Sequence, residues 1–180
     1  GELLDLEAAL NEVRRKKFQE IGILGASFGG GIANIFASKN WKKFDFLCLW
    51  YPVLNFDHTF INPYLPWLKN RIKNMKSELD EKGWTMLPNE RPFKIGKKLY
   101  DEMKEYFPYK EMEKIRIPTV ILHGDNDDYV PYEDSSKYIK SIKMKTELLT
   151  IRGAGHGFSG SDTIKGQAID KTVEVIKQYL

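Results

Sequence analysis

Cysteine is almost absent from this chain of 180 residues, in which Cys48 is the only one. A single cysteine excludes a disulfide within the chain. Cys48 lies inside an apolar run, which indicates a small buried hydrophobic side chain rather than a reactive thiol. The sequence therefore has to stabilise its fold through a packed core.

The sequence also lacks long apolar runs, a visible signal peptide and a strong excess of either charge. No run reaches the length of a membrane span, so we expect a cytoplasmic protein that does not contact a membrane. The net charge is +3, from 28 basic and 25 acidic residues. Lysines lie among Glu and Asp on predicted helices, which is typical of a solvated surface, and we expect no nucleic-acid partner.

The composition that remains is that of one ordinary globular domain. Hydrophobic residues make up 42% of the chain and aromatic residues 13%. A chain of this length can bury a core of useful size.

A glycine-bracketed serine follows an apolar run near the start of the chain. The stretch Ile21–Gly31 reads Ile-Gly-Ile-Leu-Gly-Ala-Ser-Phe-Gly-Gly-Gly, and apolar residues then continue at helical spacing to Asn40. A serine between a strand and a helix in a Gly-x-Ser-x-Gly pattern is typical of a nucleophile elbow, in which strained backbone exposes the hydroxyl. We expect Gly25 and Gly29 to avoid a clash between strand and helix, and Ser27 to be the nucleophile.

The hydrophobic pattern predicts alternating strands and helices, and hence a mostly parallel sheet flanked by helices. The predicted strands are 18–24, 44–51, 118–124 and 147–151. The predicted helices outside the central segment are a first helix that ends near Lys17, then 27–38, 132–142 and 162–180.

The composition changes between Asn55 and about Glu113, where aromatic residues alternate with Lys and Glu. This segment predicts a helix over 65–79, an extended or hairpin stretch over 84–95 and a second helix over 97–107. These elements are either further packing helices or a cap over the serine, and the position between core strands favours the cap. We therefore divide the chain into core 1–54, cap 55–113 and core 114–180, with Trp67 and Trp84 as candidate substrate-binding residues.

A serine nucleophile needs a base, and the sequence has three histidines. His58 lies among aromatic cap residues, where a surface or hydrogen-bonded role is expected, and His123 ends a strand, where a structural role is expected. His156 lies in the glycine-rich loop Gly-Ala-Gly-His-Gly-Phe directly after a predicted strand. That loop leaves its ring free to reach the serine, so His156 is the predicted base.

The acid that orients this base is among Asp125, Asp127 and Asp128. All three follow a predicted strand in the loop Gly-Asp-Asn-Asp-Asp-Tyr-Val-Pro. Any of them could equally bend the loop, and the residue types alone do not choose between them.

These motifs resemble the α/β-hydrolases of the esterase and serine-peptidase-like kind. The resemblance rests on the elbow at Ser27, on the segment from His123 to Pro131 and on the Gly-rich loop at His156, in the chain order Ser, Asp, His. It implies Asp127 as the acid, with Asp125 in reserve. A looser similarity to feruloyl and cinnamoyl esterases comes from Tyr-Pro-Val-Leu at 51–54, followed by an aromatic insertion.

The resemblance implies a serine hydrolase that cleaves a small-molecule carboxylic ester through an acyl-enzyme, with the Phe28 N–H in the oxyanion hole and no metal or cofactor. Two alternatives remain open. One is an aminopeptidase or thioesterase on the same fold, and the other is a hydrolase-like binding protein without catalysis.

One departure from the family pattern concerns the sheet. Hydrolases of this fold have about four strands before the elbow, and the loop after the third supplies a second oxyanion donor. This chain begins shortly before the elbow. We therefore expect the strand before Ser27 to be an unpaired edge that is completed in cis or by another chain, and a homo-oligomer is one way to cover it.

Overall fold

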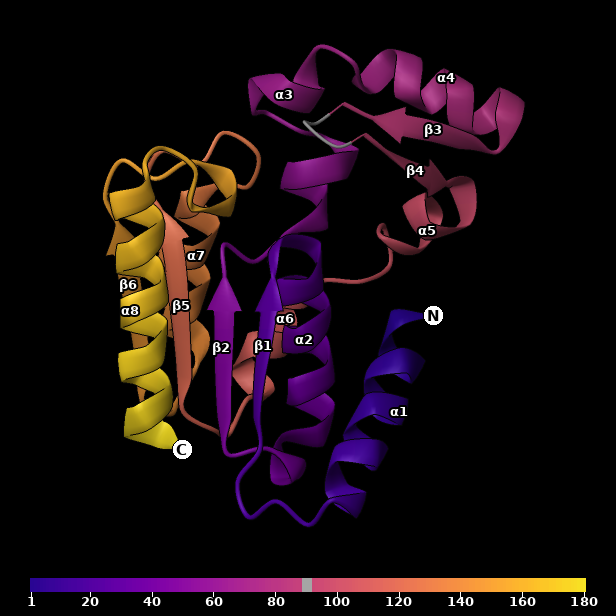
Figure 1. Cartoon of the computed structure of the whole chain (residues 1–180). Coiled ribbons are helices and arrows are strands. Elements are labelled where there is room, and N and C mark those ends of the chain that lie inside the picture. The colour runs from indigo at the N-terminus through magenta and orange to yellow at the C-terminus, as the bar shows by residue number, and fades with distance from the viewer. Residues whose placement is uncertain (89–91) are drawn as a thin grey trace.

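The computed structural model describes residues 1–88 and 92–180, and its centre is a sheet of parallel strands (Figure 1). The strand order is β1-β2-β5-β6, formed by Gly22–Ala26, Phe46–Trp50, Thr119–Gly124 and Thr146–Ile151. Every neighbouring pair is parallel, with Leu24 opposite Cys48 and Leu49 opposite Ile121. The predicted parallel sheet is therefore confirmed, and β1 is an edge strand.

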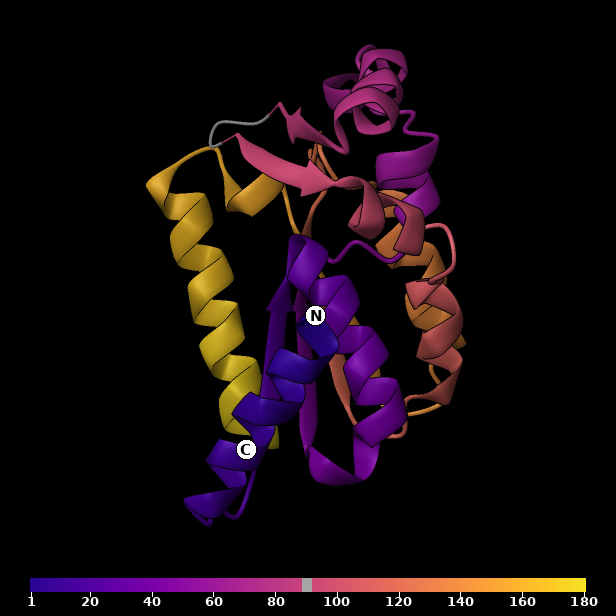
Figure 2. The same ribbon diagram turned by 90° about the vertical axis from the view of Figure 1, so that its right-hand side faces the viewer.

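Helices cover both faces of this sheet (Figures 1 and 2). One face carries α2, α6 and α7, formed by Ser27–Asn40, Pro108–Glu111 and Tyr132–Tyr138, and α1 at Glu2–Arg15 packs against α2. The opposite face carries α8, which spans Asp162–Tyr179.

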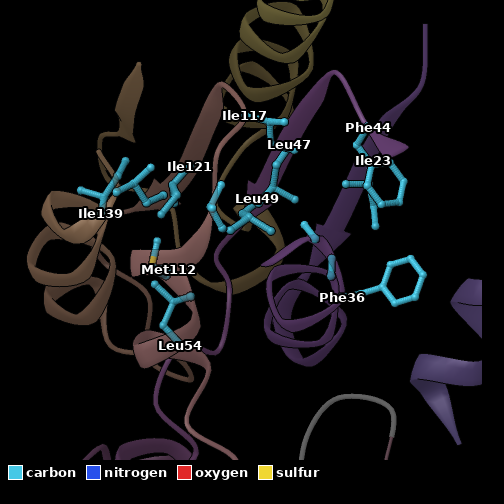
Figure 3. Packing of buried hydrophobic residues seen from close by; sticks show 14 of the residues in the cluster. Ile23, Phe36, Phe44, Leu47, Leu49, Leu54, Met112, Ile117, Ile121 and Ile139 are labelled. Atoms are coloured by element: carbon cyan, nitrogen blue, oxygen red, sulfur yellow. The ribbon is translucent and has the colours of Figure 1, made fainter. Parts of the chain in front are cut away.

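The core follows from the alternation of side chains along each strand. Leu47 and Leu49 lie on the face of the sheet that α2 covers, in a buried cluster that also contains Phe36 and Met112 (Figure 3). The intervening Cys48 points toward α8. Because both faces are covered, the strand reads as a nearly continuous apolar run, and Cys48 is buried as its position predicted.

A second group of elements stands over the carboxyl ends of the strands (Figures 1 and 2). It consists of a π-helix, the helices α3, α4 and α5, and an antiparallel pair of strands. Their bounds are Asp57–Ile61, then Pro66–Lys69 (α3), Ile72–Lys82 (α4), Trp84–Leu87 (β3), Phe93–Gly96 (β4) and Lys97–Glu102 (α5). The expected hairpin is present in its two strands, while its connection at 89–91 lies outside the described residues.

The end of the aromatic segment does not belong to this upper layer. Helix α6 and the 3-10 turn Met112–Lys114 pack against α2 beside the sheet. Asn34 Nδ2 donates to the carbonyl of Pro108 over 2.6 Å, and Ser38 Oγ donates to Glu111 over 2.7 Å. The boundary expected at residue 113 therefore falls later than the end of the layer above the strands.

Several element bounds differ from the predicted ones. The first helix ends at Arg15. β1 begins at Gly22 rather than at residue 18, and the exposed Phe18 lies in the connection between α1 and β1. The predicted helix at 65–79 is two helices, and Leu65 is extended because a residue before proline disfavours the helical conformation. The predicted helix at 97–107 ends at Glu102. Among the described residues, no helix has the length and apolarity that crossing a membrane requires.

Candidate active site

Ser27 lies at the sharp junction of β1 and α2. Its φ is +52°, a left-handed conformation that is strained for a residue with a side chain. A Cβ on Gly25 would come within 2.6 Å of the Ala33 side chain and 2.7 Å of the Gly29 carbonyl oxygen, so only glycine fits there. The elbow geometry that the motif predicted is therefore present.

The second glycine of the motif does not have the expected packing role. Beyond its chain neighbours and the backbone of its own helix, a Cβ on Gly29 would meet no described atom within 4 Å. The close approach occurs one residue later, because a Cβ on Gly30 would lie 2.8 Å from Cβ of Pro52. The expectation for Gly29 was wrong because the helix turns this position away from the loop after β2.

The structure brings the predicted serine, base and one of the three aspartates into a hydrogen-bonded chain. Ser27 Oγ lies 3.0 Å from Nε2 of His156, and Nδ1 of His156 lies 2.8 Å from Oδ2 of Asp127. Asp127 follows β5 and His156 follows β6, and parallel strands carry both loops to the same edge of the sheet as the elbow. With Nδ1 donating to the carboxylate, Nε2 is free to accept the serine proton.

Asp127 is held as a buried carboxylate. Its Oδ1 accepts the backbone N–H groups of Tyr129 and Val130 over 2.9 and 2.8 Å. Burial alone would raise the pKa of Asp127, but hydrogen bonds from His123 and His156 hold that pKa well below its usual range. The side chain is therefore charged at neutral pH.

The other two aspartates of this loop have different surroundings. Asp125 Oδ1 accepts the N–H of Gly153 over 2.6 Å and so ties the two loops together. Asp128 is exposed and lines the pocket beside Ser27. Among the three, only Asp127 contacts His156 in the hydrogen bonds of the described residues.

Aromatic rings hold the imidazole of His156 on two sides. Tyr129 stacks on it with ring centroids 5.2 Å apart and an interplanar angle of 30°. Tyr51 meets it edge-on at 4.7 Å and has a positive φ of 35°. Burial raises the pKa of Tyr51, with a contribution from the charge of Asp127, so its hydroxyl stays neutral.

A pocket of about 440 Å³ opens at Ser27. Its apolar wall includes Phe28, Phe60, Trp67, Phe93 and Tyr129. Trp67 therefore lies where a substrate-binding residue is expected, 5.0 Å from the ring of Tyr129. Trp84 does not belong to the described residues that line the pocket, because it faces outward on β3, with Lys94 Nζ 4.1 Å from its ring centroid. The structure thus places Trp84 away from this pocket, and its contact with a substrate stays a prediction.

The backbone N–H of Phe28 lies in the first turn of α2, where an N–H has no partner within its own helix. The helix dipole adds partial positive charge at this end. If Ser27 attacked a carbonyl carbon, the negative charge that develops on the carbonyl oxygen would therefore meet a donor at Phe28.

The remaining histidines divide as follows. His58 lies 2.9 Å from Asp134 through Nδ1, as expected of a hydrogen-bonded histidine above the strands. His123 is fully buried and also lies 3.3 Å from Asp127, a contact that its place at a strand end did not reveal. Among the described residues, no group of three or more His, Cys, Asp and Glu side chains could hold a metal ion.

Solved structures share this architecture. A monoacylglycerol lipase from Paleococcus ferrophilus aligns with a TM-score of 0.75 at 18% identity, over 99% of this chain and 74% of the lipase. Est1E from Butyrivibrio proteoclasticus, solved with ferulic acid bound, aligns with a TM-score of 0.70 at 22% identity, over 95% of this chain and 66% of Est1E. The fold is therefore that of the α/β-hydrolases, as the motifs predicted.

Sequence comparison also identifies the family to which the chain belongs. A bifunctional esterase/perhydrolase from Acinetobacter calcoaceticus is 33% identical over 60 residues, which are 33% of this chain and 21% of that protein. The similarity thus spans about a fifth of that relative's length. The sequence model of the prolyl oligopeptidase family matches residues 2–180. Since this match runs from the first helix to the last residue, the chain belongs to the prolyl oligopeptidase family of α/β-hydrolases.

Proposed function

We propose that this chain carries the catalytic residues of a serine hydrolase that cleaves carboxylic esters through an acyl-enzyme. One observation carries the proposal: Ser27 Oγ, His156 and Asp127 form a continuous chain with contacts of 3.0 and 2.8 Å. The strained φ of Ser27 supports it, because strain of this kind is found where a side chain has to be presented to a ligand.

In the proposed mechanism Ser27 Oγ attacks the ester carbonyl while its proton moves to Nε2 of His156. The imidazolium is stabilised by the charge of Asp127, and the Phe28 N–H binds the oxyanion. The C–O bond to the alcohol then breaks as Nε2 returns the proton to the leaving oxygen. Water, deprotonated by the same nitrogen, hydrolyses the acyl-serine and regenerates the Ser27 hydroxyl.

Enzymes of this fold use a second oxyanion donor from the loop after the third strand of the sheet. We propose that this donor comes from a preceding segment in cis or from another chain. Loss of one such donor costs about 10²–10³ in rate, so the 180-residue chain would be a weak catalyst by itself.

The aromatic lining of the pocket favours a substrate with an apolar or aromatic acyl group. Phe28 and Phe60 lie with their centroids 6.2 Å apart, and Phe60 and Trp67 are again 6.2 Å apart, both edge-to-face. An aryl or short alkyl group between these rings would bury its surface against aromatic carbon, which is favourable on transfer from water.

Labelling with a fluorophosphonate tests the proposal. The probe phosphonylates an activated serine, so mass spectrometry should find the adduct on Ser27 in the wild-type chain and no adduct in Ser27→Ala. Cleavage of short p-nitrophenyl esters by the complete enzyme should disappear in the same variant, while its circular dichroism stays that of the wild type. An unlabelled Ser27 in a folded protein would favour a hydrolase-like binding protein instead.

An aminopeptidase is the second candidate, and the exposed carboxylate of Asp128 in the pocket wall favours it. A substrate with a free amino group would place its positive charge near this residue. Aminoacyl p-nitroanilides distinguish the two candidates. If the enzyme prefers them to neutral esters, and Asp128→Asn removes that preference, the peptidase assignment replaces the esterase assignment.

A further inference from the structure

His123 lies beneath the Ser27–His156–Asp127 chain, at the carboxyl end of β5, and its side chain is fully buried. Its Nδ1 lies 2.8 Å from Oγ of Ser135 on α7. Its Nε2 lies 3.2 Å from the carbonyl oxygen of Val130 and 3.3 Å from Oδ2 of Asp127. The ring thus joins a helix, a strand end and the loop that carries the proposed acid.

The surroundings determine which ring nitrogen carries a proton. A carbonyl oxygen and an ionised carboxylate oxygen can only accept hydrogen bonds, so Nε2 has to donate. The hydroxyl of Ser135 can both donate and accept, and it satisfies Nδ1. The Nε2 proton is therefore shared between Val130 and the same carboxylate oxygen that His156 contacts.

We propose that His123 is a positioning residue of the catalytic machinery, which aims Oδ2 of Asp127 at His156. This inference rests on the proposed function. Asp127 Oδ1 is fixed by two backbone N–H groups, those of Tyr129 and Val130. Oδ2 has one side-chain contact on each side, the 2.8 Å contact with His156 and the 3.3 Å contact with His123. Without His123, the carboxylate could rotate about its Cβ–Cγ bond or move toward the base.

The electrostatics of Asp127 agree with this geometry. Burial raises the pKa of this carboxyl, and the hydrogen bond from His123 opposes that effect together with the bond from His156. Tyr51, which directly follows β2, also interacts with the charge of Asp127, and Asp125 and Asp128 lie in the same loop. A change at His123 therefore acts directly on the charge of the Asp127 carboxylate.

Two amide variants separate positioning from simple packing. In His123→Gln the side-chain amide reaches the place of Nε2 and can still donate toward Asp127. In His123→Asn the amide reaches only the place of Nδ1, so it keeps Ser135 and loses Asp127. Both variants replace the ring by a smaller amide, and Asn is the smaller of the two. A role in packing alone therefore predicts a lower Tm for His123→Asn without a change in the titration of Asp127.

The expected result is a split between these variants. Since hydrogen bonds to charged groups contribute more than neutral ones, His123→Asn should lower kcat for a p-nitrophenyl ester by about 10–100-fold with little change in KM, and His123→Gln should lose less than about 5-fold. A ¹³C NMR titration of the Asp127 carboxyl should move to higher pH in the Asn variant only.

Equal kcat values and equal Asp127 titrations in the two variants would overturn the proposal. The titration needs no turnover, so it decides the role of His123 even if fluorophosphonate fails to label Ser27 and the proposed function falls. If His123→Asn does not fold, Ser135→Ala takes its place, because it releases Nδ1 and keeps the ring. We expect Ser135→Ala to lower kcat by a smaller factor than His123→Asn does. An unchanged kcat in Ser135→Ala would contradict the positioning role.

Discussion

Asp127 and Asp134 are both buried carboxylates, yet their surroundings shift their pKa values in opposite directions. Asp127 combines two backbone N–H groups with two histidines, and these donors overcome the cost of burial. Asp134 has burial as its main influence, and the pair with His58 compensates only in part, so its pKa is raised. The first aspartate is suited to catalysis and the second to linking the segment above the strands with α7.

The role of Asp127 can be tested against its neighbour in the same loop. We expect Asp127→Asn to lower turnover by up to about 10⁴, because an amide no longer fixes the tautomer of His156. Asp125→Asn is the matched control, since it leaves that contact intact and weakens only a bond to the Gly153 N–H. Steady-state ester kinetics decide between them, and a larger loss in the Asp125 variant would move the acid to that residue.

Asp134 predicts a pH dependence of stability. Its folded pKa is raised, so the folded state binds this proton more tightly than the unfolded state does. The free energy of unfolding therefore falls as pH rises above the unfolded value of about 3.9, and the loss persists above the folded pKa. Asp134→Asn keeps an acceptor for His58 without the charge.

We expect this variant to have a higher Tm than the wild type at pH 7, and a smaller advantage at pH 3. Calorimetry across this range, with the exposed Asp162→Asn as control, measures the difference. A variant that melts at lower temperature at pH 7 would show that the pair with His58 outweighs the buried charge.

The residues that we propose for catalysis differ in how far the sequence predicts them. Ser27 and His156 could be predicted from glycine spacing, because the backbone around each needs conformations or close approaches that leave a pattern in the sequence. Asp127 could be chosen only through the family resemblance, since three aspartates share one turn. The contact between His123 and Asp127 depends on how β5 and its loop fold back, and no local pattern records it.

At the scale of elements, the hairpin β3–β4 is a part of the aromatic segment that reaches the pocket at Ser27. Phe93 on β4 lines the pocket, while Trp84 on β3 faces outward at the other end of the same ladder, opposite Gly96. The two residues therefore give a matched pair on one element. They test the proposal that this segment is a cap that selects the acyl group.

Phe93→Ala should lower kcat/KM for an aryl ester relative to an acetyl ester by about 10-fold, because an apolar contact of this size contributes 1–3 kcal/mol to discrimination. Trp84→Ala should leave that ratio unchanged. Both ratios come from p-nitrophenyl ester kinetics. If the ratio stays constant in both variants, the hairpin contributes packing only.

The elements themselves could largely be predicted, because periodicity reports which side chains are buried. β5, β6 and α8 lie close to their predicted places. A strand that is covered on both faces needs a run of apolar residues, and a helix that covers a sheet needs one apolar stripe. The breaks were harder to predict. The apolar spacing of 65–79 continues across Asn70 and Arg71, which separate α3 from α4, so periodicity alone does not show where α3 ends.

At the scale of the whole molecule, the helices among the described residues leave an apolar surface uncovered. β1 is the edge of the sheet, and Leu24 on this strand is exposed. Four exposed apolar side chains recur along α8 at positions that share one face of a helix, namely Ile169, Val173, Ile176 and Leu180. The C-terminal end of this helix lies against β1, because a Cβ on Gly22 would lie 2.8 Å from Leu180.

The last prediction follows from this surface. An unpaired edge strand beside exposed apolar side chains favours association, so we expect the 180-residue chain alone to self-associate, with low esterase activity. Val173→Glu should reduce the apparent mass in light scattering, whereas Gln178→Glu adds the same charge on another exposed position of α8 and should not. A preceding segment, supplied in cis or as a second chain, should restore both a defined mass and the rate. A monomeric wild-type chain that melts cooperatively and hydrolyses esters at full rate would contradict this prediction, because it would show that the exposed edge and the stripe on α8 need no partner.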